Sequence, residues 1–125
     1  MYRKILVVIG GLCCLFWGIA HLFPLNAIVK GFGNISIDNI YIIRMEWINE
    51  GFTLIFIGVL IILATILSKE KNYTLKIVYA VSAVMLFSMA ILSIFTGNNI
   101  NFLPFKICVY IFSVSGILIL QGVLK

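Results

Sequence analysis

The sequence has little charge. It contains nine Lys or Arg residues and four Asp or Glu residues among 125, or 10%, whereas about a quarter of the residues in soluble proteins are charged. Hydrophobic residues make up 63%, and the mean hydropathy is +1.21. A soluble fold of this length cannot bury so much apolar surface, so the composition excludes an ordinary soluble domain and predicts a membrane protein.

Four stretches have no Lys, Arg, Asp or Glu: 5–23, 51–67, 77–95 and 107–124. Each is close to the roughly 20 residues that a helix needs to cross a bilayer. We therefore predict an all-α integral membrane four-helix bundle with up-down-up-down topology, a single transmembrane domain over 1–125 with spans at about 5–23, 47–67, 77–96 and 103–124. The first stretch resembles a signal peptide, but it is longer than a typical apolar signal core, so we expect an uncleaved first helix.

The positive charges are distributed unequally between the two predicted sides. Six of the nine Lys and Arg residues lie on the side of the termini and the second connection, and three lie on the other side: Lys30, Arg44 and Lys106. The positive-inside rule then predicts that both termini are cytoplasmic, in a multi-pass protein of the cell (plasma) membrane. Short basic runs beside spans favour contact with lipid headgroups and disfavour nucleic acid as a partner.

The connections predict how the helices are arranged. Pro24 should end the first helix, and the outer loop 24–46 should contain a short interfacial helix. Ser36 or Asp38 can cap a helix that starts at about Asn39 and continues into span two. The two later connections are short, so we expect spans two, three and four to pack in sequence. The small residues of span one allow close packing, either inside the bundle or in a homo-oligomer: Gly10, Cys14 and Gly18.

One group of ionisable residues lies at the predicted outer face: His21, Glu46, Glu50 and Lys106. Glu46 and Glu50 are one helical turn apart with Asn49 beside them, and His21 lies near the end of span one at a similar depth. Such groups at membrane depth are costly and usually face the interior of the bundle. The sequence therefore predicts an outward-facing polar pocket with these candidate ligand-binding residues: Trp17, His21, Glu46, Trp47, Asn49, Glu50 and Lys106.

A purely structural interpretation of these residues also stands. A helix dipole favours glutamates near its N-terminus, and Lys106 can extend to the headgroups.

We predict no metal site, because the chain has one His, no C-x-x-C, and no known zinc spacing in His21, Glu46 and Glu50. A redox role for Cys14 and Cys108 requires spans one and four to pack against each other at the membrane depth of these two cysteines. The sequence indicates no particular cofactor and no catalytic residue.

Two segments of the chain are 11–24, GLCCLFWGIAHLFP, and 50–58, EGFTLIFIG. In these segments the chain resembles the DoxX-like group of small four-helix membrane proteins. The resemblance implies a subunit of a membrane-associated, quinone-linked redox complex. From the residues alone we expect an accessory or ligand-binding subunit without catalytic activity. Its expected partners are the lipid bilayer and either a membrane protein or further copies of the chain in a homo-oligomer. The alternatives are a membrane redox subunit that binds a quinone-like ligand and an oligomeric proton-coupled exporter that uses Glu50.

Overall fold

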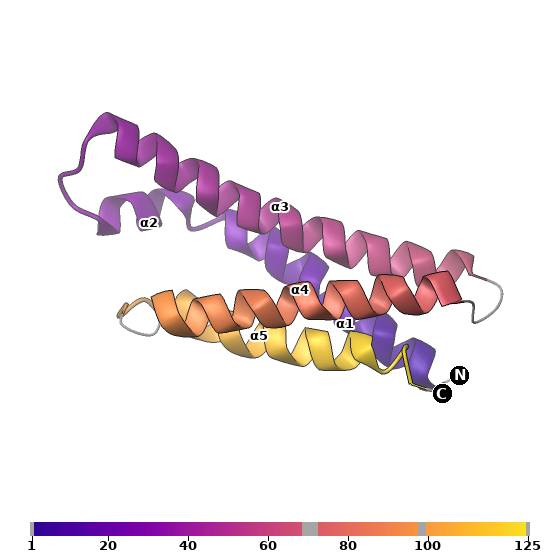
Figure 1. Cartoon of the computed structure of the whole chain (residues 1–125). Coiled ribbons are helices and arrows are strands. Elements are labelled where there is room, and N and C mark those ends of the chain that lie inside the picture. The colour runs from indigo at the N-terminus through magenta and orange to yellow at the C-terminus, as the bar shows by residue number, and fades with distance from the viewer. Residues whose placement is uncertain (1, 69–72, 98–99, 125) are drawn as a thin grey trace.

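The computed structural model describes residues 2–68, 73–97 and 100–124, and within these ranges the chain is all-α (Figure 1). Its helices are α1 (Tyr2–Leu22), α2 (Leu25–Gly31), α3 (Ile37–Leu67), α4 (Tyr73–Gly97) and α5 (Leu103–Leu120). In the described part of the chain, four of these are long and apolar enough to cross a membrane: α1, α3, α4 and α5. Many large apolar side chains on their outer surfaces are exposed, as lipid contact requires. The chain is therefore a small polytopic membrane protein.

Glycines bring α1 and α3 into close contact. A Cβ atom added at Gly18 would lie 2.8 Å from the carbonyl oxygen of Gly51, and one added at Gly58 would lie 2.7 Å from that of Gly11. Side chains at these positions would hold the helices apart, so the glycines allow backbone-to-backbone packing. Gly10 instead faces Ser115 of α5. The small residues of span one thus serve contacts inside the protein, on two sides of α1.

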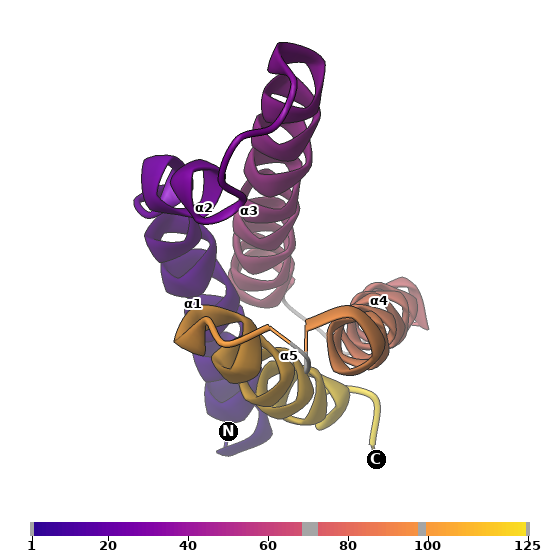
Figure 2. The same ribbon diagram turned by 90° about the vertical axis from the view of Figure 1, so that its left-hand side faces the viewer.

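The order of packing differs from the sequence prediction. α1 packs against both α3 and α5, and α4 packs against α5, whereas α3 and α4 touch each other only sparsely. Figure 2 shows the spans as an arc in the order α3, α1, α5, α4. The prediction that spans two and three would pack closely was wrong, because a short connection holds two helices together only at the connected end.

A buried hydrogen bond marks the end where α3 and α4 do meet. The hydroxyls of Thr65 and Tyr79 are 2.8 Å apart, and Thr65 also donates to the carbonyl of Ile61 at 2.6 Å. From this contact α3 and α4 diverge toward the other end of the molecule (Figure 1). They therefore form a V that opens at the end where the sequence places its candidate residues.

The chain between the first two spans contains the short helix α2 and then the start of α3. Pro24 follows the end of α1, and Gly33 adopts a φ of +70°, which favours glycine. Ser36 caps α3 by accepting a hydrogen bond from the backbone N–H of Asn39 at 3.3 Å. α3 then runs for 31 residues without interruption, which is longer than one membrane crossing needs.

The N- and C-terminal ends of the described chain lie at the same end of the molecule (Figure 1). This agrees with an even number of spans in up-down arrangement. Several charges that support the predicted cytoplasmic side lie outside the described residues: Lys69, Lys71 and Lys125.

Candidate functional site

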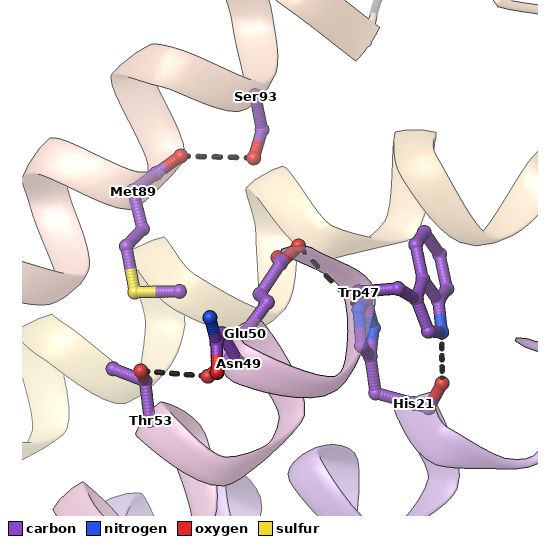
Figure 3. A network of polar contacts seen from close by, with 7 residues as sticks. All are labelled: His21, Trp47, Asn49, Glu50, Thr53, Met89 and Ser93. Atoms are coloured by element: carbon purple, nitrogen blue, oxygen red, sulfur yellow. Dashed lines mark hydrogen bonds and ion pairs between the residues drawn. The ribbon is translucent and has the colours of Figure 1, made fainter. Parts of the chain in front are cut away.

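His21 lies in the last turn of α1 and is only 3% exposed. Its imidazole stacks on the indole of Trp47, with ring centroids 3.9 Å apart and an interplanar angle of 12°. The indole N–H of Trp47 donates to the backbone carbonyl of His21 at 2.6 Å (Figure 3). Carbonyls in the last turn of a helix lack intrahelical donors, so this bond satisfies a group that would otherwise be buried unpaired. Trp47 thus holds both the backbone and the ring of His21.

Glu50 approaches the imidazole from α3. Its Oε2 lies 3.4 Å from Nε2 of His21, and its side chain is 31% exposed (Figure 3). The proximity follows from the glycine contact: His21 is three residues after Gly18, and Glu50 immediately precedes Gly51. Because these two glycines bring the backbones of α1 and α3 together, the two ionisable side chains meet at the edge of that contact.

Cys108 of α5 completes a cluster with His21 and Glu50. One ligand atom of each residue lies within 4.8 Å of the other two, and Cys108 is 2% exposed. Nε2 of His21 makes no geometrically adequate hydrogen bond to any described residue, although Glu50 is near. The three side chains, from three helices, therefore surround a common point, and the buried nitrogen of His21 beside it has the 3.4 Å contact with Glu50 but no hydrogen bond of adequate geometry.

A groove of about 520 Å³ lies beside this cluster, between the diverging halves of α3 and α4. On the α3 side it is lined by Asn49, Glu50 and Thr53, and on the α4 side by Met85 and Met89, among others. Figure 3 shows Met89 extending toward Asn49 and Thr53 across the groove. The volume is in the range of small-molecule sites, and the lining combines polar side chains with apolar ones.

The hydroxyl groups along the groove are bonded to their own helices. Thr53 donates to the carbonyl of Asn49 and Ser93 donates to that of Met89, each at 2.8 Å. Their oxygen lone pairs remain as acceptors. The groove therefore offers carboxylate, amide and hydroxyl groups next to methionine side chains, which adapt to irregular shapes.

The other residues predicted from sequence lie at varying distances from this centre. Glu46 and Asn49 are exposed and line the groove, while Trp47 is buried against His21. Trp17 lies beside Cys108 with its indole nitrogen buried, and no described residue accepts a hydrogen bond from it in good geometry. Lys106 is exposed in a separate cleft between α4 and α5, so the structure does not bring it to the His21–Glu50 pair.

Cys108 is the residue that sequence reasoning did not place in the site. The metal interpretation considered Glu46 as the third group, since it is one turn from Glu50 in sequence. In the structure the third group is a thiol from α5, because α1 packs directly against both α3 and α5. The sequence related Cys108 only to Cys14, by their similar depth in spans four and one, and not to His21.

Comparisons with known proteins identify no relative. No protein-family model matches the chain, and neither the curated proteins nor the solved structures give a significant match. The resemblance to the DoxX-like group consequently gains no support, and what is established is a small four-span helical membrane protein.

Proposed function

We propose that this protein is a membrane-embedded binding protein for a lipid-soluble ligand with a polar head and an apolar body. The groove between α3 and α4 carries the proposal, because it combines a volume of about 520 Å³ with polar side chains such as Glu50 and apolar side chains such as Met89. α3 and α4 separate at this end, so a ligand can enter sideways from the bilayer. A quinone-like molecule has this combination of a polar ring and an apolar tail.

The position of Glu50 supports the same proposal. A carboxylate inside a membrane protein is costly unless it is paired or solvated, and such residues commonly mark binding sites or pathways. Glu50 has a partly exposed side chain that lines the groove and contacts His21. A polar headgroup would accept or donate hydrogen bonds at Asn49 and Glu50 while the tail lies along the methionines.

The test is native mass spectrometry of the protein extracted in mild detergent, with the mass of any retained molecule identifying it. We expect a defined organic adduct on the wild type that is lost in Glu50→Gln and in Met89→Trp, which fills the groove. Asp38→Asn is the matched control, since it makes the same kind of change at an exposed position in the first turn of α3. Only nonspecific lipid, bound equally by every variant, would overturn the proposal and favour an accessory role.

We further propose that the groove opens toward the outer face of a plasma membrane, with both termini cytoplasmic. The excess of Lys and Arg on the side of the termini supports this orientation. Single cysteines at Asn34 and Tyr73, both exposed positions at opposite ends, test it in a background without native cysteines. An impermeant thiol reagent should label position 34 and not position 73 in intact cells, and the reverse pattern would invert the topology.

A further inference from the structure

We infer that His21, Glu50 and Cys108 form a binding site for a divalent transition metal of the zinc class. Their ligand atoms all lie within 4.8 Å of one another, and Nε2 of His21 is 3.4 Å from Oε2 of Glu50. In a tetrahedral zinc site, bonds of about 2.0–2.3 Å place neighbouring ligand atoms roughly 3.4–3.6 Å apart. The His21–Glu50 separation already fits this geometry, and Cys108 needs to approach by about 1 Å.

The nitrogen of His21 that lacks a well-formed hydrogen bond is the observation that points to an ion. His21 is 3% exposed, and its Nε2 makes no hydrogen bond of adequate geometry to a described residue, although a carboxylate oxygen lies near it. A buried polar atom without a well-formed hydrogen bond is unfavourable, and a neutral imidazole nitrogen is a good ligand for zinc. The stacked indole of Trp47 and its bond to the His21 carbonyl keep the ring fixed in this orientation.

The charges balance when the ion is bound. A carboxylate and a thiolate together neutralise a dication, and His21 contributes a neutral ligand, so the complex carries no net charge in a medium of low dielectric constant. Binding deprotonates the Cys108 thiol, and the proton leaves to water in the groove. Glu50 and Cys108 both line the groove, which provides the route for the ion and access to a fourth coordination position.

The ion would join three helices at the open end of the V. His21 belongs to α1, Glu50 to α3 and Cys108 to α5. This inference does not depend on the proposed organic ligand. The mass of the molecule that the protein retains distinguishes the two proposals, because a metal ion is much lighter than an organic ligand.

Cobalt titration of the untagged, reduced protein in detergent tests the site. We expect one Co²⁺ per chain, with visible bands of tetrahedral cobalt and a near-ultraviolet band from thiolate-to-cobalt charge transfer, and displacement by Zn²⁺. Cys108→Ser should abolish the charge-transfer band. Glu50→Gln should weaken affinity by about tenfold or more, since even the loss of an outer-shell partner costs roughly 10–100-fold. Cys13→Ser is the control, because this partly buried cysteine lies outside the cluster.

Two results would overturn the inference: a wild-type protein that binds no Co²⁺ at micromolar concentration, or a Cys108→Ser variant that keeps the charge-transfer band. If Cys108→Ser does not fold, alkylation of the wild type by N-ethylmaleimide decides. Zn²⁺ should slow the modification of Cys108 and leave the rate at Cys13 unchanged. Equal rates at Cys108 with and without Zn²⁺ would refute the site.

Discussion

Replacing Gly58 with alanine should destabilise the protein by forcing α1 and α3 apart. The added Cβ would lie 2.7 Å from both the carbonyl oxygen of Gly11 and the backbone nitrogen of Leu15. Nonbonded heavy atoms prefer about 3.5 Å, so the helices would have to separate by about half an ångström or more. Overpacking typically costs about 1–3 kcal/mol, and we expect the upper half of that range because backbone atoms cannot rotate away. Alanine regains about 1 kcal/mol of helix propensity, which leaves a net loss of about 1–2 kcal/mol.

The assay is unfolding in mixed micelles of mild detergent and sodium dodecyl sulfate, followed by circular dichroism. Gly31→Ala is the control, because nothing lies within 4 Å of the Cβ that it would add. Gly18→Ala should behave like Gly58→Ala, since its Cβ would lie 2.8 Å from the carbonyl oxygen of Gly51. If Gly58→Ala and Gly18→Ala were as stable as Gly31→Ala, the close contact between α1 and α3 would be refuted.

Two other contacts allow similar predictions. Trp47→Phe keeps an aromatic ring on His21 but leaves the backbone carbonyl of His21 without the 2.6 Å hydrogen bond. The free energy of unfolding in the same assay should therefore fall by about 1–3 kcal/mol. A variant as stable as wild type would contradict this role of the indole. Thr65→Val and Tyr79→Phe each remove one hydroxyl of the 2.8 Å contact between α3 and α4. A double-mutant cycle should give a coupling of about 0.6 kcal/mol and at most about 1.7 kcal/mol, as for other hydrogen bonds between membrane helices, and additive effects would show that the hydroxyls do not interact.

The number and approximate extent of the spans could be predicted from the sequence because the signal is local. Each span is an apolar stretch without Lys, Arg, Asp or Glu, and a bilayer selects such stretches by length and hydropathy alone. The start of α3 was similarly readable, since Ser36 is a capping residue that acts on the backbone three residues later. His21, Glu50 and Trp47 could be recognised as candidates because charged and polar groups are rare in this chain.

Local sequence signals did not predict which helices pack against each other. Gly11, Gly18, Gly51 and Gly58 are recognisable as small, but their pairing depends on the crossing of α1 over α3. Consecutive antiparallel spans were expected to pack, and instead α3 and α4 diverge from the Thr65–Tyr79 contact. The reason is that lipid offers no hydrophobic drive for one apolar helix face over another, so shape decides the partners.

The sequence by itself therefore determined that this is a four-span membrane protein and that His21, Glu46 and Glu50 lie near the same end of the spans. Only the tertiary structure decided that a thiol from α5 joins His21 and Glu50, and that a groove opens beside them. Span length and polarity are properties of single segments. The cluster and the groove, in contrast, depend on how closely separate helices approach each other. Glycine contacts set the distance between two helices where they cross, whereas a short connection sets it only at the connected end.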